Sequence, residues 1–535
     1  MNYSPYEYPF ESRRTMVYGS RGMVATGHPL AASAGLQILQ KGGNAVDAAI
    51  AMAACLTVVE PCCNGLGGDG FGIIHDGERL YGLNASGKSP QLLNGEEIRA
   101  KGYKSMPLHG WTPVNVPGVV GGWMAMWERF GSISIADIME PAIEYARSGA
   151  VVQPQTAINW KEDWELKKHF LSDELFQPFI KLFSINGKPY EAGMVFKSEE
   201  MARTLEEIAD TKGESFYRGR LAKIIDQHSN KTGGLLRGED LEAYHPQWVE
   251  PISSNYKGYD IWEIPPNGHG ISVLIALEII KELKLSAHRN GLDVHRQIEA
   301  MKLAFADVMQ YITDSNYMKT SPNELLSSSY IRQRKELIGE KAMVPVAGRP
   351  KSAGTVYMAA ADKSGKMVSW IQSNYTNFGS GIVVPGTGIS LHNRGCNFTL
   401  EPGHVNEASG GKKPYHTIIP GFITKENNAV GAFGIMGAFM QPQAHVQVVL
   451  NLIEYGLNPQ AALDAWRWQW MGGKKVELEP QVPFEIASEL MDRGHHVKYS
   501  KFRNHMGRGQ IILKDGKGIF AGGTEPRTDG AILAF

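Results

Sequence analysis

The sequence predicts an α+β protein, helix-rich in its first part and strand-rich in its last part. The N-terminal third and residues 135–345 carry mostly helical patterns, and short alternating strands follow from about residue 355. The small, polar segment at residues 349–354 marks the change. With 43% apolar and 20% charged residues, the composition is that of a globular protein with a large core. The length of 535 residues suggests three or four ordinary domains.

Helical patterns open the chain. Residues 31–40 end at Lys41 and two glycines, which is typical of a helix that terminates in a cationic turn. Residues 45–59 are apolar on nearly all sides, which predicts a buried helix. A glycine cluster at residues 65–70 follows, and residues 71–74 read as a strand. Glycine is abundant throughout, with 60 residues, so we expect many tight turns and close backbone approaches.

The predicted secondary structure changes at two further places along the chain. The helical region at residues 135–345 is interrupted by a strand-like segment near residues 259–264, with a turn at residues 265–268. After residue 355 the pattern predicts strands, a helix at residues 444–455, and short strands to the end.

Charge and composition exclude several classes of partner. Lys and Arg number 54 and Asp and Glu 55, so a net charge of -1 argues against nucleic acid or an anionic membrane surface as the main partner. No run of 18 apolar residues predicts a membrane span, and the N-terminus shows no signal peptide, so we expect a cytoplasmic protein. Four cysteines do not make a disulfide framework, and we expect them to be reduced.

Two glycine motifs resemble phosphate loops. Residues 65–70 fit G-x-G-x-x-G but follow a helix and open a strand, which is the wrong context. Residues 82–89 fit G-x-x-x-x-G-K-S, although Asn94-Gly95 would break the required helix almost at once. Because residues 82–89 match the motif in full, a P-loop nucleotide-binding protein is kept as the competing class. Neither a G-x-S-x-G elbow nor an H-E-x-x-H motif occurs, and we expect no metal and no cofactor.

A predicted hairpin contains the first pair of candidate catalytic hydroxyl groups. The sequence Asp362-Lys-Ser-Gly365 suits a three-residue loop with glycine in the left-handed position. In that register paired residue numbers add up to 728, so Thr355 opposes Ser373. One hydroxyl could orient the other, although Thr–Ser pairs also occur in ordinary sheets.

Several blocks along the chain resemble the γ-glutamyltranspeptidase family of N-terminal-nucleophile (Ntn) hydrolases. They are GGNAVDAA at residues 42–49, EPCCNGLGGDGF at 60–71, VPG at 116–118, PP at 265–266 with Gly270, EAMKLAFAD at 299–307 and PRTDG at 526–530. The resemblance implies a four-layer αββα sandwich. Within it, residues 1–354 and 355–535 would form the large and small portions of one intertwined domain.

The resemblance also implies a mechanism. The family cuts its own backbone before a threonine, which matches Thr355, and the new α-amine serves as base with a pKa near ~8. Ser373 matches the hydroxyl that orients the nucleophile, and Gly437 and Ala438 match the backbone oxyanion donors. The products would form an α/β heterodimer, with a dimer of heterodimers as a further assembly. A relative that never cleaves itself is the catalytically silent alternative.

The expected substrate-binding positions depart from the family pattern. Ser86 stands where γ-glutamyl enzymes hold the α-carboxylate with Arg, and Asn397 stands where they hold the amine with Asp. The full set of substituted positions is Ser86, Tyr375, Arg394, Asn397, His416 and Thr417. The chain is thereby more similar to the cephalosporin (glutaryl) acylase-like subgroup.

These departures suggest a substrate class. We expect a small-molecule amide, γ-glutamyl-like or glutaryl-like, and favour an acyl group that ends in a carboxylate without an α-amine. Arg394 could anchor that carboxylate by a bidentate contact, with His416 beside it. Alternatively, Arg394 pairs with a carboxylate of the protein itself.

Overall fold

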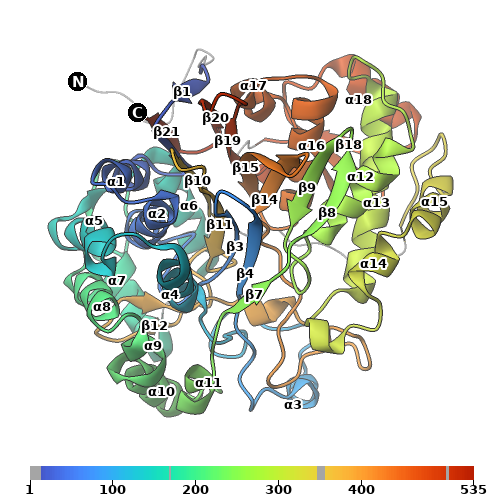
Figure 1. Ribbon diagram of the computed structural model, residues 1–535. Helices are drawn as coiled ribbons and strands as arrows, with labels where there is room; N and C mark the ends of the chain where they lie inside the picture. The colour runs from blue at the N-terminus through green and yellow to red at the C-terminus, as the bar shows by residue number, and fades with distance from the viewer. Residues whose placement is uncertain (1–13, 168–169, 171, 346–355, 502–504) are drawn as a thin grey trace.

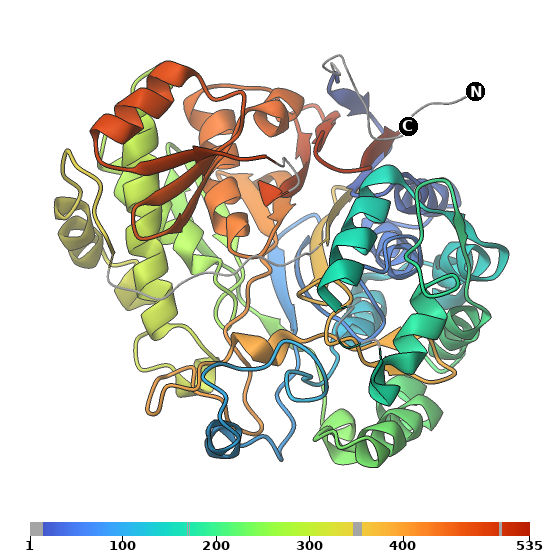
Figure 2. The same ribbon diagram turned by 180° about the vertical axis from the view of Figure 1, so that it is seen from behind.

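Two large sheets pack face to face and carry helices on both outer faces. The computed structural model describes residues 14–167, 170, 172–345, 356–501 and 505–535. Figure 1 shows α1, α2, α4 and α5 on one side of the sheets and α12, α13, α16 and α18 on the other. Figure 2 gives the same arrangement from behind. The expected four-layer αββα sandwich is confirmed.

Among the described residues, each large sheet has seven strands, and all neighbouring strands run antiparallel. The first sheet is ordered β21 (Ala531–Ala534), β2 (Gly22–Thr26), β10 (Val356–Asp362), β11 (Met367–Ser373), β3 (Asp69–His75), β4 (Leu80–Ala85) and β7 (Gln247–Val249). The second is ordered β1 (Val17–Gly19), β20 (Phe520–Thr524), β19 (Arg508–Lys514), β15 (Asn428–Met436), β14 (Gly421–Lys425), β9 (Tyr259–Glu263) and β8 (Ile252–Tyr256).

Helices and small strand pairs complete the layers. Over the first sheet and below it lie α1 (Pro29–Gln40), α2 (Ala45–Val59), α3 (Gly95–Ala100), α4 (Val119–Phe130), α5 (Ile135–Ser148), α6 (Pro154–Lys167), α7 (Gln177–Phe183), α8 (Glu199–Asp210), α9 (Glu214–Arg218), α10 (Arg220–Lys231) and α11 (Gly238–Glu242). Between residues 271 and 492 the helices are α12 (Ile271–Lys281), α13 (Gly291–Tyr311), α14 (Pro322–Leu325), α15 (Ser328–Glu336), α16 (Met440–Val449), a π-helix (Leu450–Glu454), α17 (Pro459–Asp464) and α18 (Phe484–Asp492). The small sheets are β5 (Ala150–Val151) with β6 (Val195–Phe196), β12 (Val383–Val384) with β13 (Ile389–Ser390), and β16 (Trp468–Gly472), β17 (Lys475–Leu478) and β18 (His496–Tyr499).

Strand alternation divides the apolar core into layers. On β10, Tyr357 and Ala359 face the other sheet, whereas Met358 and Ala360 face the helices that include α2. Helix α2 is buried along its whole length, as its apolar sequence predicts. Its N-terminus is closed by a capping box between Asn44 and Asp47.

The segments before and after residue 355 contribute strands to the same sheets. Strands β10 and β11 lie between β2 and β3, and β14 and β15 lie between β19 and β9. The chain therefore does not divide into the three or four domains that its length suggests.

The predicted hairpin register is confirmed for the described residues. Val356 pairs with Gln372 and Ala361 with Met367, so the paired numbers add up to 728. Gly365 has φ +89°, in the left-handed region that the turn requires. Thr355 lies outside the described residues.

The structure does not support the competing interpretation of residues 82–89 as a phosphate loop. The first four residues of the motif, at positions 82–85, belong to strand β4, and the next helix is the six-residue α3. Gly87 serves close packing instead, because a Cβ there would lie 1.8 Å from the carbonyl oxygen of Val116.

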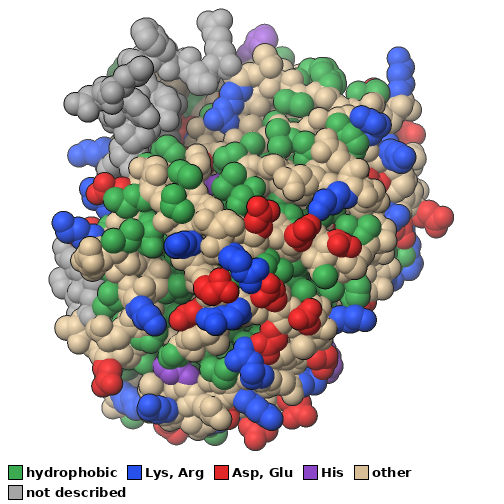
Figure 3. All heavy atoms as spheres, turned by 90° about the vertical axis from the view of Figure 1, so that its left-hand side faces the viewer, with side chains coloured by type: hydrophobic (Ala, Val, Ile, Leu, Met, Phe, Trp, Pro, Cys, Tyr) green, Lys and Arg blue, Asp and Glu red, His purple; other side chains and the backbone are tan. Residues whose placement is uncertain are grey.

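The surface carries charges of both signs. Figure 3 shows Lys and Arg interspersed with Asp and Glu over the face that includes α5 and α8. No helix in the described part of the chain is long and apolar enough to cross a membrane.

Asp362 joins the hairpin to α2 and provides a test of the fold. Its carboxylate accepts from the amide of Ala45 at 2.7 Å and from that of Ser364 at 2.8 Å. We expect Asp362→Ala to lower the free energy of unfolding by about 2 kcal/mol, because the buried amide of Ala45 and the partly buried amide of Ser364 lose their acceptor. Exposed Asp210→Ala should change it by less than about 0.5 kcal/mol. Equal urea midpoints for the two variants would contradict this role.

His28 makes a pH-dependent contribution that can be isolated. Its ring is fully buried and caps α1 by accepting from the amide of Leu30. Burial lowers the pKa of His28 to about 3. Below pH 6.5 the unfolded chain therefore binds a proton that the folded chain does not, and stability is lost as the pH falls. Between pH 7.5 and 5.5, His28→Asn should spare about 1 kcal/mol of that loss in urea titrations. An identical pH slope in both proteins would refute the assignment.

Candidate active site

The ends of three strands meet at one edge of the first sheet. Strand β10 begins there, β11 ends at Ser373, and β3 begins at Asp69, which pairs directly with Ser373. Ser373 and Asp69 have the odd residue numbers of the side chains that face the second sheet.

Ser373 is held by the turn that follows it. Its side chain is buried, and its Oγ accepts from the amide of Tyr375 at 2.7 Å. Tyr375 has φ +76°, so the chain reverses sharply after the strand.

The facing sheet presents a tight turn at the end of β15. Gly437 and Ala438 have φ of +139° and +50°, and α16 begins at Met440. Within the described residues, neither the Gly437 nor the Ala438 amide donates a hydrogen bond. Two free amides before a helix N-terminus can stabilise a developing oxyanion.

A buried histidine that the sequence reasoning missed supports this turn. His445 accepts from the amide of Ile435 through Nε2 at 3.1 Å and donates from Nδ1 to Glu263 at 2.8 Å. Burial lowers the pKa of His445 to about 3, so the ring is neutral, as this hydrogen bonding requires. His445 belongs to α16, so this helix holds the last residues of β15 in place.

Arg394 is paired inside the protein. Its Nε and Nη2 lie 3.3 Å from the two carboxylate oxygens of Asp69, and its Nη1 donates to Thr417 Oγ1 at 2.8 Å. The guanidinium lies 4.3 Å from the ring centroid of Tyr375. The structure thus contains the internal pairing that was the alternative for Arg394, and Asp69 is the partner.

His416 completes this buried cluster. Its Nε2 lies 2.6 Å from Asp69 Oδ2, and its Nδ1 accepts from the amide of Ile418. Burial, with Arg394 nearby, lowers the pKa of His416 to about 3, so a neutral ring donates to the carboxylate. Although burial opposes it, Arg394 and His416 hold the pKa of Asp69 below its ordinary value. The structure brings together Tyr375, Arg394, His416 and Thr417.

Ser86 lies in a separate polar group. Its Oγ donates to Asn84 Oδ1 at 2.6 Å, and Asn84 also accepts from Lys413 at 3.3 Å. Burial lowers the pKa of Lys413 to about 8. Asn397 ends the short 3-10 helix that begins at Arg394, and its Nδ2 has no partner within the described part of the chain.

Two described clusters have the composition of a metal site. Glu60, Cys62 and Cys63 form one, and His295, Glu299 and His495 form the other. In the second cluster, hydrogen bonds explain the contacts. His295 lies 2.9 Å from the Gly339 carbonyl and 2.8 Å from His495, and Glu299 accepts from Lys302.

Comparison with known proteins agrees with this arrangement. The sequence profile described as gamma-glutamyltranspeptidase matches residues 31–535. The glutathione hydrolase-like YwrD proenzyme of Bacillus subtilis (strain 168) is 34% identical over 532 residues, covering 97% of this chain and 99% of the relative. The acylase ACY 1 proenzyme of Pseudomonas sp. (strain V22) is 32% identical over 543 residues, covering 98% and 96%.

A solved structure is similar over the whole length. Cephalosporin acylase from Bacillus halodurans is 50% identical, with a TM-score of 0.97, and the match covers 100% of this chain and 99% of that one. The resemblance inferred from the sequence blocks is confirmed: the chain belongs to the gamma-glutamyltranspeptidase family, as a hydrolase proenzyme similar to glutathione hydrolases and cephalosporin acylases.

Proposed function

We propose that the chain is a self-processing amidohydrolase and acyltransferase whose nucleophile is Thr355. The proposal is supported by the β10–β11 register, in which Val356 pairs with Gln372, so that one further step in the same register would set Thr355 opposite Ser373. The Gly437–Ala438 turn follows β15 in the facing sheet. Relatives named as proenzymes support a cut in the backbone.

Processing would proceed by an acyl shift. Thr355 Oγ attacks the carbonyl carbon of Gly354, the C–N bond to Thr355 breaks, and an ester with a free α-amine forms. Water then hydrolyses the ester, leaving a carboxylate on Gly354. The same hydroxyl, with the α-amine as base, next attacks the substrate amide and forms an acyl-enzyme that water or an amine resolves. Ser373 would orient the hydroxyl, and the amides of Gly437 and Ala438 would bind the oxyanion.

The two products would remain together as an α/β heterodimer. Strand β10, from the small portion, pairs with β2 and β11 and lies inside a sheet that the large portion completes. Separation of residues 1–354 from 355–535 would expose the apolar layers on both faces of that sheet.

The proposed substrates are γ-glutamyl-like or glutaryl-like amides, with the glutaryl type favoured. Asn397 carries no charge to pair with an α-amine, and Asp69 already neutralises Arg394. We therefore propose that Arg394 acts on the substrate through Thr417 and Tyr375, which it positions, rather than as a free cation.

Self-cleavage gives the first test. Purified protein should run as two fragments on a denaturing gel, and the smaller one should begin at Thr355. Thr355→Ala should leave the chain intact because no hydroxyl remains, whereas Thr355→Ser should still cleave. Cleavage of Thr355→Ala at the same bond would exclude this nucleophile. An intact chain in the unmodified protein would favour the catalytically silent alternative.

Substrate choice gives the second test. We expect glutaryl-4-nitroanilide to be hydrolysed with a kcat/KM at least about tenfold above that of γ-glutamyl-4-nitroanilide, because an ammonium group would be buried without a counter-charge. Asn397→Asp should raise γ-glutamyl turnover relative to glutaryl turnover. The expectation fails if the unmodified protein prefers the γ-glutamyl anilide and Asn397→Asp does not move the ratio.

A further inference from the structure

A buried polar group lies beside Asp69, on the side of β3 where β4 ends. Strand β4 ends at Ala85, next to the start of β3, so Ser86 lies at the same edge of the sheet as Asp69. Asn84 pairs with Phe71, whose side chain faces the second sheet, and the alternation along the strand puts Asn84 and Ser86 on that face too. The polar group and Asp69 therefore share one edge and one face of the first sheet.

Lys413 supplies the cation of this group. Its side chain is 7% exposed, and its Nζ donates to Asn84 Oδ1 at 3.3 Å and to Gln247 Oε1 at 2.9 Å. Ser86 Oγ donates to the same oxygen of Asn84 at 2.6 Å. The ammonium and the Ser86 hydroxyl therefore lie next to one another, on either side of a single acceptor atom.

The group is joined directly to the segment at residues 414–417, which carries His416 and Thr417. Asn267 accepts from Asn84 Nδ2 at 3.0 Å and donates to the carbonyl of Pro414 at 2.9 Å. The amide of His416 donates to the carbonyl of Asn267 at 3.0 Å. Lys413 therefore lies on the side of the sheet edge where the proposed substrate-binding residues gather.

The hydrogen-bond partners of Lys413 leave its charge unbalanced. Two other buried lysines, Lys167 and Lys302, each donate to a carboxylate at 2.6 Å, that of Asp163 and that of Glu299. Both acceptors of the Lys413 ammonium are neutral amide oxygens. In the described part of the chain no ion pair includes Lys413, and its third N–H is not used. A buried cation of this kind is costly unless a negative charge joins it.

The acidic side chains near Lys413 already have other partners. Asp69 is bound by Arg394 and His416, and Asp314 accepts from two backbone amides, one of them that of Lys413 itself. Burial lowers the pKa of Lys413 to about 8, although Asp314 and Asp69 oppose the shift. The amine therefore remains mostly protonated at pH 7 and is available to an anion.

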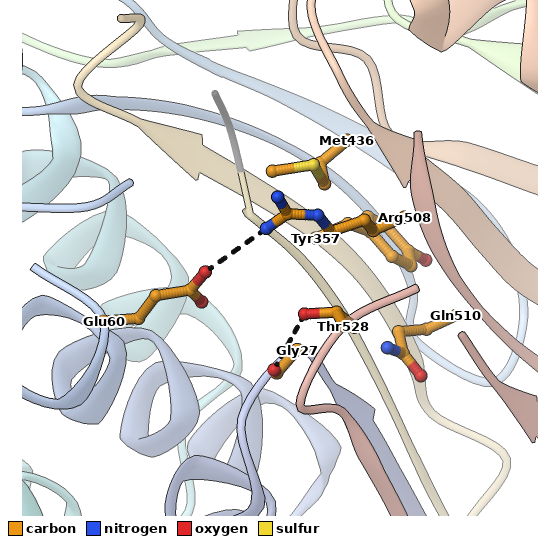
Figure 4. Close-up of a pocket in the computed structure, with 7 residues that line it drawn as sticks. All are labelled: Gly27, Glu60, Tyr357, Met436, Arg508, Gln510 and Thr528. Atoms are coloured by element: carbon orange, nitrogen blue, oxygen red, sulfur yellow. Dashed lines mark hydrogen bonds and ion pairs between the residues drawn. The ribbon is translucent and has the colours of Figure 1, made fainter. Parts of the chain in front are cut away.

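Arg508 is a second buried cation with unused donors, but it lies elsewhere. Figure 4 shows its guanidinium pointing toward Glu60 across a small pocket. Its Nη2 donates to Asn159 Oδ1 at 2.9 Å, and among the described residues its Nε and Nη1 have no hydrogen-bond partner. Gly27, which follows β2, lines this pocket, so the pocket lies on the opposite side of β10 from β4. Its volume of about 10 Å³ is room for one water and not for an acyl group.

We propose that Lys413 binds the terminal carboxylate of the acyl group, next to Ser86, and so selects acyl groups that end in a negative charge. This inference rests on the proposed function, because it concerns the acyl end of the same substrate. Strand β4 is two strand spacings, about 10 Å, from β11 and Ser373. A five-carbon acyl group that is attacked near Ser373 is long enough for its carboxylate to meet the ammonium of Lys413.

Matched substrates test the proposal. Glutaryl-4-nitroanilide and pentanoyl-4-nitroanilide have acyl chains of equal length and differ in the terminal carboxylate. We expect Lys413→Gln to lower kcat/KM for the glutaryl anilide by about 30-fold, mainly through KM, and for the pentanoyl anilide by less than about threefold. Lys413→Arg should retain part of the glutaryl activity, because it keeps the charge. Exposed Lys223→Gln is the matched control and should behave as the unmodified protein.

A binding measurement separates this proposal from the proposed function. Glutaramate, the monoamide of glutaric acid, should raise the thermal midpoint of the unmodified protein and of Lys223→Gln, whereas pentanamide, which lacks the carboxylate, should not. Lys413→Gln should lose the glutaramate effect. This result would support the site even if neither anilide is turned over, in which case the proposed function alone fails. Equal losses on the two anilides, or a glutaramate effect that survives Lys413→Gln, would overturn the proposal and leave Lys413 a structural role.

Discussion

The antiparallel pairing of β10 with β11 is the constraint on which the rest of the site depends. It fixes which residue opposes which, and a shift by one position would turn every side chain of β10 to the opposite face. The register is set by the tight turn at Gly365 and by Asp362, whose carboxylate also accepts from the first amide of α2. The turn at Gly365 thereby sets the pairing at the other end of the hairpin, where the hydroxyl groups of Thr355 and Ser373 are proposed to act.

The site is built from buried charges that are compensated to different degrees. Asp69, Arg394 and His416 form a cluster in which a carboxylate is held by a guanidinium and a neutral imidazole. Such a group is costly to bury and is tolerated because each partner is satisfied. Arg508 differs, since two of its donors have no partner among the described residues.

Local features of the fold could be predicted from the sequence, and long-range pairings could not. The bounds of α2 and the hairpin register follow from apolar periodicity and turn residues, and the structure agrees with both. Asp69 could not be predicted as a site residue, because its glycine cluster matches a phosphate motif and a family block without indicating a partner, and Arg394 is 325 positions away. Its signal was an acidic residue in an otherwise apolar, glycine-rich segment. Arg508 and the Glu263–His445 pair carry no local signal, because their roles arise only when the two sheets pack together.

We propose that Thr355, the residue preceding β10 in the sequence, carries the acyl group during turnover. Protein quenched in acid while it hydrolyses glutaryl-4-nitroanilide can be digested and analysed by mass spectrometry for a glutaryl ester. We expect the adduct on Thr355, and we expect it to disappear when the substrate is exhausted. An adduct on another side chain, or steady turnover with none on Thr355, would contradict it.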